Sequence, residues 1–575
     1  MRQNTNKDIS IVLCGAAGQG IATVEGLLTK ILKRSGFNVF STSEFMSRVR
    51  GGTNSTTIRI SSDRVRAYCD RIDLLIPLTP EAVPHVKERL TPATCIIGDK
   101  KMFGDHPLGG CTLLEISFEK IAEEVGNRVY SNSVAVGVLA GLCRANRTVI
   151  SETLSERFTR MGTEIVSKNL EAANRGYDLA EDLIESGQVP FELNLYSNYE
   201  VSEELLLNGR DAVGLGAIAG GCNYITFYPM APSTGVGAFL AQHRQEFGII
   251  TDQSEDELSV VNKAYGAWYT GARAMVTTSG GGFALMTEAL SLIGITESPM
   301  VIHLGQRPGP ATGMPTRTEQ GDLELALYAG HGYFPRIILS PGSLKEAFLL
   351  TQKAFNLADE FQVPVIILTD HYLINSMYNL TALPSNLPVT KMFIETDQNY
   401  ERFKFTENGI SPRGIPGYGK GLIRVDSHTH TENSDITENP EIRTKTVDKR
   451  LKKLELIKKH VFPPKLTGDS NYKTLVIGWG STYHIIDEAI RKVSEKRNGV
   501  AFLHFKQVYP LHPLTSEYLQ KAEKTIIIEN NPTSQFGKLI KLETGIQIDK
   551  TVLKYSGYPF SVEEIIDHLN KLIKG

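Results

Sequence analysis

The chain is poor in cysteine and has no cysteine pattern typical of a metal cluster. Its six cysteines are Cys14, Cys69, Cys95, Cys111, Cys143 and Cys222; none forms a CxxC pair, and none follows Cys222. A [4Fe–4S] cluster needs four thiolates, usually in clustered spacings. We therefore expect no such cluster on this chain, and we interpret the six as small buried hydrophobic residues in a reducing compartment.

Long apolar runs and a strong net charge are also missing. No stretch approaches the ~18 apolar residues that span a bilayer. The polar N-terminus MRQNTNKDIS lacks the apolar segment of a secretory signal. With a formal net charge of −3 and a pI near 6.5, the chain as a whole does not attract the negatively charged backbone of nucleic acids. We expect a soluble, cytoplasmic protein with no nucleic-acid or membrane partner and, at 575 residues, roughly three or four domains.

Apolar strand-like runs alternate with helical patterns along the chain. The first part contains DISIVLC (8–14), a helix from about Ile21 to Arg34, FNVFST, TTIRIS, DLLIPL and TCIIGD, and a helical stretch over 150–187. The middle part contains YITFYP, RAMVTTSGGG, PMVIHLG, PRIILS and VPVIILTD, and the last part TLVIGW, GVAFLHF, KTIIIEN and TVLKYS. This alternation predicts an α/β fold of several three-layer domains, each on a mostly parallel sheet.

Other segments have plain structural interpretations. Residues 186–200 look like a linker, and 444–460 (TKTVDKRLKKLELIKKH) predict a charged surface helix. GLGAIAGG (214–221) follows no strand and is interpreted as a closely packed small-residue helix. The H-x-H pair His428 and His430 is more typical of a solvent-exposed loop than of a metal site, and no metal ligand is predicted.

A glycine-rich turn joins the first strand to the first helix. Gly15, Gly18 and Gly20 in GAAGQG would let backbone N–H groups approach a phosphate at the helix N-terminus. The spacing differs from the dinucleotide fingerprint G-x-G-x-x-G, so a simple tight turn is an equal alternative. Arg48 and Arg50 in SRVRGG add cations that could face a polyphosphate.

The most distinctive stretch is a set of Gly-, Pro-, Ser- and Thr-rich loops at strand ends. They are YPMAPSTG (228–235), TSGGG (278–282) and GQRPGPATGMPTRTEQGDL (305–323). The last loop contains Arg307 and Arg317. Arginine binds carboxylates in a bidentate manner, so two arginines in a rigid loop favour an anionic carboxylate substrate.

These motifs together resemble the α subunit of the 2-oxoacid:ferredoxin oxidoreductases, in the form with a γ domain fused to its N-terminus. GAAGQGI and VRGG resemble the γ domain, YPMAPST to GDL the thiamine-pyrimidine domain, and LVIGWGS with IIIENNPTSQFGKLI the transketolase-like C-terminal domain. The implied boundaries are 1–190, 200–445, 446–471 (a linker) and 472–575. The resemblance implies thiamine diphosphate, coenzyme A and ferredoxin as reaction participants. It also implies that Gly15, Gly18, Gly20 and Arg50 bind a cofactor and that the γ-like domain contacts coenzyme A.

The resemblance assigns one catalytic residue. Enzymes of this family use a glutamate that hydrogen-bonds the aminopyrimidine of thiamine, and the matching position is Glu257 in EDELSVVNKAYGA. Without the resemblance, Glu255, Asp256 and Glu257 would be interpreted as an exposed acidic run at the start of a helix.

The same resemblance implies substrate contacts from Tyr228, Pro229, Ser233, Thr234, Arg307 and Arg317. Arg307 occupies the place of the carboxylate-binding arginine, with Arg317 as the alternative, and both are expected on a surface loop. The family pattern usually has Thr where this chain has Ala231, so Ser233, Thr234 or a water must replace its hydroxyl.

The motif GDG, with which thiamine enzymes bind Mg²⁺ and the diphosphate, is absent from the sequence. The resemblance therefore implies a β subunit that carries GDG, Mg²⁺ and the [4Fe–4S] clusters, in a dimer of αβ heterodimers. The expected activity is oxidative decarboxylation of a 2-oxoacid to its acyl-CoA, only in the presence of that subunit. We favour 2-oxoglutarate; pyruvate, branched-chain 2-oxoacids and a non-catalytic nucleotide-binding scaffold are the alternatives.

Overall fold

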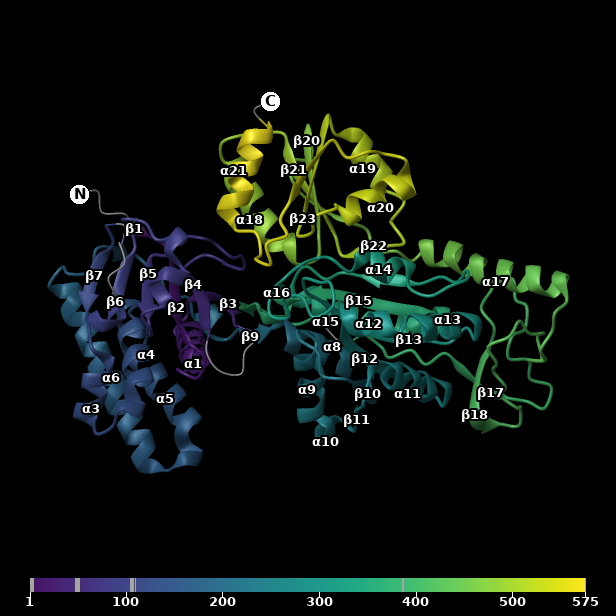
Figure 1. Cartoon of the computed structure of the whole chain (residues 1–575), viewed down its shortest axis with the longest axis horizontal. Coiled ribbons are helices and arrows are strands. Elements are labelled where there is room, and N and C mark those ends of the chain that lie inside the picture. Colours follow the sequence, from purple (N-terminus) through teal and green to yellow (C-terminus); the bar gives the residue numbers. More distant parts are fainter. Residues whose placement is uncertain (1–4, 47–51, 104–107, 109, 385–386, 574–575) are drawn as a thin grey trace. The chain divides into compact units, whose positions relative to one another are not determined.

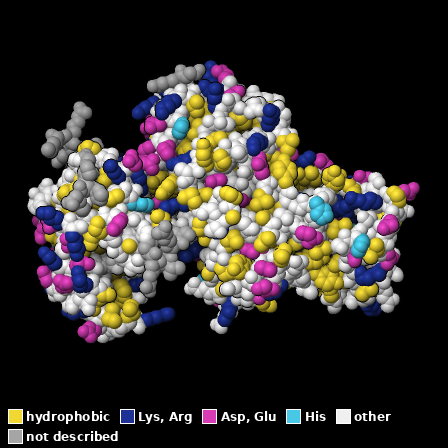
Figure 2. All heavy atoms as spheres, in the orientation of Figure 1, with side chains coloured by type: hydrophobic (Ala, Val, Ile, Leu, Met, Phe, Trp, Pro, Cys, Tyr) yellow, Lys and Arg dark blue, Asp and Glu magenta, His cyan; other side chains and the backbone are white. Residues whose placement is uncertain are grey.

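The computed structural model describes residues 5–46, 52–103, 108, 110–384 and 387–573 (Figure 1). The chain divides into two compact units. The first comprises residues 1–207, 375–382 and 561–563, and the second 208–374, 383–560 and 564–575. Within the described ranges, no helix is long and apolar enough to cross a membrane. On the face shown in Figure 2, basic and acidic side chains are interspersed.

The first unit contains a sheet in the order β7-β6-β5-β2-β4-β3-β16-β9. Its strands are β2 (Asp8–Ala16), β3 (Asn38–Glu44), β4 (Thr53–Ser61), β5 (Leu74–Pro77), β6 (Cys95–Gly98), β7 (Thr112–Glu115), β9 (Leu205–Asn208) and β16 (Met377–Leu380). Its helices are α1 (Ile21–Arg34), α2 (Ala82–His85), α3 (Phe118–Val125), α4 (Ser131–Leu142), α5 (Arg147–Phe158), α6 (Thr163–Glu185) and α7 (Tyr199–Ser202). Strands β1 (Thr5–Asn6) and β8 (Glu192–Leu193) form a separate pair.

This sheet is mixed, where the sequence suggested mostly parallel strands. Strands β2, β5, β6 and β7 are parallel neighbours, whereas β4 lies antiparallel between β2 and β3. The connection from β3 to β4 is too short for a crossover helix, and a short connection forces antiparallel pairing. Strand β16, far along the chain, then adds antiparallel to β3.

The second unit is built on two large sheets and has a separate two-stranded pair as well. The larger has the order β11-β10-β12-β13-β15-β14-β22 and is parallel except for β22. Its strands are β10 (Tyr224–Phe227), β11 (Ile250–Gln253), β12 (Ala274–Ser279), β13 (Met300–Gln306), β14 (Ile337–Leu339), β15 (Pro364–Asp370) and β22 (Gln507–Tyr509). The helices around it are α8 (Gly209–Ala219), α9 (Thr234–Gln242), α10 (Arg244–Phe247), α11 (Glu257–Tyr269), α12 (Gly280–Leu285), α13 (Thr287–Ile295), α14 (Leu323–Tyr328), α15 (Leu344–Phe361) and α16 (His371–Asn375).

The C-terminal sheet has the order β19-β21-β20-β23-β24. Its strands are β19 (Lys465–Gly468), β20 (Thr474–Trp479), β21 (Val500–Phe505), β23 (Lys524–Glu529) and β24 (Lys550–Leu553). The remaining elements are β17 (Phe393–Thr396), β18 (Arg413–Gly419), α17 (Pro440–Lys458), α18 (Tyr483–Ser494), α19 (Thr515–Lys521), α20 (Gln535–Thr544) and α21 (Val562–Ile573). The predicted α/β fold class is confirmed, and the four-part division of the chain stays a prediction.

Helix α8 contains residues 214–219 of the run GLGAIAGG, so the predicted helix is present. Strand β9 directly precedes α8, so the expectation that the run follows no strand is wrong. A side chain at Gly216 would place its Cβ 2.4 Å from the Phe348 carbonyl oxygen of α15, and one at Gly214 would lie 2.2 Å from the Phe239 ring. The glycines let α8 approach its neighbours closely, which confirms the small-residue helix.

Helix α17 corrects the prediction of a surface helix. Its Lys449, Arg450 and Lys453 are nearly inaccessible to solvent. The Lys449 and Lys453 ammonium groups lie 2.7 and 2.5 Å from the two carboxylate oxygens of buried Glu297. Sequence pattern alone does not reveal this, because the partner lies about 150 residues earlier in the chain and lysine is ordinarily exposed.

Replacing Glu297 with Gln should destabilise the second unit strongly. The change leaves two buried ammonium groups without a counter-charge, which typically costs about 3–5 kcal/mol. Trp268 and Trp479 are buried in this unit and are the only tryptophans of the chain, so fluorescence during urea unfolding reports on it. The control is Glu455→Gln, an exposed acid of the same helix, expected within about 0.5 kcal/mol of the wild type. Equal midpoints for the two variants would contradict the buried cluster.

Candidate active site at the strand ends of the second unit

The carboxyl ends of β10, β12, β13 and β15 lie along one edge of the larger sheet. Because these strands are parallel, the loops that follow them gather there. Such an edge is where open α/β sheets bind ligands. It receives the segments YPMAPST, TSGGG and the long loop after β13, which are the loops that the sequence singled out.

Glu257 lies at the start of α11, and its side chain is directed into the protein. Asp256 caps the helix, its Oδ1 accepting from the Ser259 N–H at 2.7 Å, and the Glu255 side chain is 73% exposed. Glu257 by contrast is only 4% exposed. The expectation of an exposed acidic run therefore fails for this residue.

The Glu257 carboxyl has an oxygen without a hydrogen-bond partner among the described residues, and it packs against a glycine. Oε1 is buried with no hydrogen-bond partner among the described residues, and burial raises the pKa of the carboxyl. A Cβ at Gly282 would lie 2.4 Å from both Oε1 and the Thr278 hydroxyl. A buried, unpaired carboxyl costs free energy unless a ligand supplies the missing contact. Glu257 therefore fits a ligand nitrogen.

Arg307 directly follows β13, and its side chain contacts the loop after β10. Its Nη1 donates to the Ala231 carbonyl oxygen at 2.7 Å, while its buried Nε has no partner among the described residues. Burial lowers the pKa of this guanidinium, an effect opposed by nearby Asp322. The backbone of Ala231 thus orients Arg307, although the methyl group itself offers no hydroxyl.

Asp322 is a member of the site that sequence reasoning missed. A Cβ at Gly280 would lie 2.5 Å from its Oδ1, and Oδ2 is buried with no partner among the described residues. Burial and the charge of Glu319 raise the Asp322 pKa to about 7, and Arg307 opposes this. In the sequence, Asp322 stands in Gly321-Asp322-Leu323, which differs from the motif GDG at its third position. The signal that could have identified it is its position after the arginine loop and just before a helix.

Arg317 lies in a different environment from Arg307. It is 7% exposed, and its guanidinium is stacked on the Tyr558 ring, 4.9 Å from the centroid. The expectation that both arginines lie on a surface loop is thus wrong for Arg317, because residues of the C-terminal part of the unit cover it. Of the two arginines, Arg307 is the one that donates to Ala231 at the strand ends.

The four smaller predicted contacts divide into two pairs. Tyr228 is 40% exposed and Pro229 is exposed as well. Ser233 is fully buried and its hydroxyl donates to the Met230 carbonyl oxygen at 2.8 Å. Thr234, half-buried at the start of α9, is therefore the better placed of the two hydroxyls to replace the Thr missing at position 231.

In the first unit, the glycine-rich turn borders a cavity of about 310 Å³. Gly18 and Gly20 have the left-handed backbone angles φ 92° and 80°, and a side chain at Gly20 would collide with Asn132. The Gln19 side chain accepts from the Ala16 N–H and donates to the Leu78 carbonyl, so one turn amide is already satisfied. Gly15 lies at the end of β2, and Arg48 and Arg50 lie outside the described residues.

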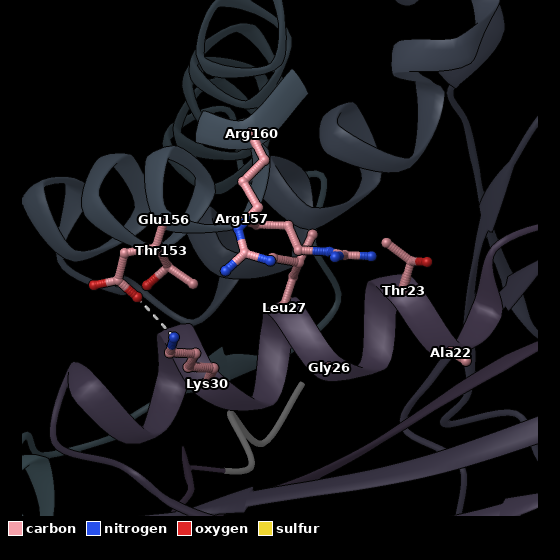
Figure 3. A pocket seen from close by; sticks show the side chains of 9 residues that line it. All are labelled: Ala22, Thr23, Gly26, Leu27, Lys30, Thr153, Glu156, Arg157 and Arg160. Carbon is pink, nitrogen blue, oxygen red and sulfur yellow. Dashed lines mark hydrogen bonds and ion pairs between the residues drawn. The ribbon is translucent and has the colours of Figure 1, made fainter. Parts of the chain in front are cut away.

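A second cavity of the first unit, about 690 Å³, lies between α1 and α5 (Figure 3). Its charged side chains are exposed, and Lys30 pairs with Glu156 at 2.7 Å. No charged group there is desolvated, so this cavity has weak grounds for a specific site.

The structure also shows how far the six cysteines and the H-x-H pair are buried. Five cysteines are buried and Cys111 is partly so, which confirms the structural interpretation; burial raises the pKa of Cys143 to about 12. His428 is exposed, but His430 is buried against the Phe403 ring with its pKa lowered to about 4 by burial. The expectation of a solvent-exposed pair is wrong for His430.

Comparison with known proteins gives consistent matches. Residues 10–179 match the family described as pyruvate ferredoxin/flavodoxin oxidoreductase, and residues 215–449 its thiamine diphosphate-binding family. The chain is 30% identical to a 2-oxoacid:ferredoxin oxidoreductase subunit alpha of Sulfolobus sp, over 98% of this chain and 97% of that one. It is 33% identical to the 2-oxoglutarate synthase subunit KorA of Archaeoglobus fulgidus, over 57% of this chain and 88% of that one.

A solved structure is similar over nearly the whole chain. It is the 2-oxoglutarate:ferredoxin oxidoreductase from Magnetococcus marinus with 2-oxoglutarate, coenzyme A and succinyl-CoA bound. The two are 29% identical, with a TM-score of 0.92, over 99% of this chain and 100% of that one.

Replacing Asp322 with Asn should stabilise the second unit in a pH-dependent way. A carboxyl whose pKa is raised to about 7 in the folded state, from 3.8, favours folding below pH 3.8 and loses that contribution as pH rises to about 7. The advantage of the variant should therefore grow between about pH 4 and 7 and level off above, at roughly 1–4 kcal/mol. Urea unfolding at several pH values measures this, with Asp448→Asn, an exposed acid of α17, as control. A difference independent of pH would contradict the assignment.

Proposed function

The chain belongs to the 2-oxoacid:ferredoxin oxidoreductase family, and we propose that it provides the substrate-binding and thiamine-activating half of an enzyme that oxidises 2-oxoglutarate to succinyl-CoA. The observation that carries this proposal is the buried carboxyl of Glu257, whose Oε1 has no partner among the described residues, at the strand ends that also present Arg307. The relatives named for 2-oxoglutarate support the substrate; pyruvate and branched-chain 2-oxoacids are the alternatives.

Glu257 is assigned to the thiamine aminopyrimidine. Thiamine diphosphate, when bound, supplies the carbon nucleophile and the electron sink for decarboxylation. The raised pKa of Glu257 suits this role, because burial makes its carboxyl a better partner for sharing a proton with a ring nitrogen. Gly282 leaves room for the Glu257 carboxyl, because a side chain at that position would collide with Oε1.

Arg307 is assigned to the C1 carboxylate of the substrate and Arg317 to the distal carboxylate of 2-oxoglutarate. Ala231 holds one Arg307 nitrogen, so the remaining donors of the fork are available to a carboxylate. Tyr228, Pro229 and Thr234 would border the substrate from the loop after β10, and Ser233 would orient that loop through Met230.

The other half of the site is assigned to a β subunit that carries GDG, Mg²⁺ and [4Fe–4S] clusters and reduces ferredoxin. Large apolar side chains stay exposed next to the candidate residues: Leu258 is 50%, Leu285 50%, Met314 45% and Tyr228 40% exposed. Exposed apolar groups around a site favour a partner that covers them. The turn Gly15–Gly18–Gly20, with Arg50, is proposed to contact coenzyme A from the first unit.

Glu257→Gln should abolish most activity without unfolding the protein. Loss of a positioned acid–base group typically costs about 10²–10⁴-fold in rate, whereas a neutral amide removes no charge pair from the buried site. The assay is viologen reduction by the complex reconstituted with its β subunit, thiamine diphosphate, coenzyme A and 2-oxoglutarate. Glu255→Gln is the matched control, since it changes an exposed acid two residues away. Near-normal turnover by the Glu257 variant would exclude its assigned role.

Arg307→Ala should lower kcat/KM for 2-oxoglutarate and pyruvate alike. Removing one partner of a buried charge pair costs about 2–5 kcal/mol, or roughly 30- to several-thousand-fold. Arg307→Lys should restore only part, since lysine lacks the fork. Arg317→Ala should be the milder change and should penalise 2-oxoglutarate alone. Because Arg317 packs on Tyr558, unfolding of this variant must be measured in parallel. Unchanged kcat/KM in both variants would refute the carboxylate clamp.

A further inference from the structure

A cavity of about 420 Å³ in the second unit is lined by none of the residues assigned above. Helix α13 forms one side of it, and α17 and the segments 331–334 and 427–429 form the others. Its volume falls within the range of small-molecule sites, about 300–1,000 Å³.

The cavity contains a desolvated guanidinium with unused donors. Arg450 is 5% exposed, and the structure gives it one hydrogen bond, from Nε to the Tyr333 carbonyl oxygen at 3.3 Å. Its four terminal N–H donors have no partner among the described residues. Arg443, about two helical turns earlier on α17, also lines the cavity and is exposed.

The charge behind the cavity is strongly positive. Lys449, Lys453 and Arg402 are all buried, and they share one buried carboxylate, Glu297, with Arg450 nearby. Glu288 is the acid that lines the cavity, and it is exposed to solvent, where screening weakens its effect. Four buried cations against one buried carboxylate leave an excess positive charge that an anion would neutralise.

The remaining lining is partly apolar. Leu292 and Ile295 of α13 and Phe334 contribute hydrophobic surface, while Ser427 and Thr429 contribute hydroxyl groups. We propose that this cavity binds a small organic anion, a phosphate or carboxylate on a compact apolar body, with Arg450 and Arg443 holding the oxygens. The site is separate from the chemistry at Glu257, and none of its lining residues is assigned to the reaction.

The test is isothermal titration calorimetry, which measures the Kd of the full chain for phenyl phosphate, benzoate and inorganic phosphate. Phenyl phosphate or benzoate should bind more tightly than inorganic phosphate, because only they fill the apolar part. Whichever binds better identifies the head group. Arg443→Gln should weaken that binding at least about tenfold, the usual effect of losing a charge-assisted hydrogen bond. Arg450→Gln should weaken it more.

Lys445→Gln is the matched control, because Lys445 is an exposed cation of α17 that does not line the cavity. It should bind the probe like the wild type. Because Arg450 is buried and its variant could fold poorly, the exposed Arg443 variant decides the outcome. No binding by the wild type up to millimolar probe, or equal losses in the Arg443 and Lys445 variants, would overturn the proposal.

Discussion

The buried side-chain amide of Gln320 fixes the loop between Arg307 and Asp322 to the C-terminal sheet, and the candidate site depends on it. Its Nε2 donates to the Trp479 carbonyl oxygen at 2.8 Å and its Oε1 accepts from the Asn530 N–H at 2.9 Å. The amide is completely buried, so breaking either bond would leave a polar group unsatisfied at a cost of about 1–3 kcal/mol. These two hydrogen bonds therefore hold a loop rich in glycine and proline in one conformation. The C-terminal sheet contains no residue assigned to catalysis, but it positions the loop that presents the candidate site residues.

Missing side chains shape the site as much as present ones. Gly280 and Gly282 stand where any Cβ would collide with the carboxyl of Asp322 or Glu257. Both carboxyls are buried against these glycines, and burial raises the pKa of each. A buried acid whose oxygen has no partner favours a ligand that donates a hydrogen bond, because that bond offsets the cost of desolvating the oxygen. The same glycines that cost backbone entropy are thus required by the chemistry.

Sequence reasoning predicted the strands and the dense loops because both depend on local pattern. The runs YITFYP, PMVIHLG and VPVIILTD are all strands of one parallel sheet, and the helix from Ile21 to Arg34 has the predicted bounds. What it missed depends on contacts between distant positions. The burial of Lys449 and Lys453 requires Glu297, the cover over Arg317 comes from Tyr558, and Asp322 becomes a site residue only once Gly280 is placed beside it. The antiparallel half of the first sheet likewise depends on β16, more than 300 residues beyond β3. Local patterns do not encode such pairings.

The consecutive helices α12 and α13 separate opposite electrostatic environments. At the start of α12, Gly282 adjoins a carboxyl oxygen without a partner among the described residues. Beyond the end of α13, buried cations surround the single carboxylate of Glu297. A helix C-terminus carries a partial negative charge, which favours cations nearby. Arg402 uses this directly, because its Nη2 donates to the carbonyl oxygens of Thr296 and Glu297 just past the end of α13. Glu297 then neutralises Lys449 and Lys453, and Arg450 is left facing the cavity. One end of this pair of helices therefore suits a ligand that donates a proton, and the other suits an anion.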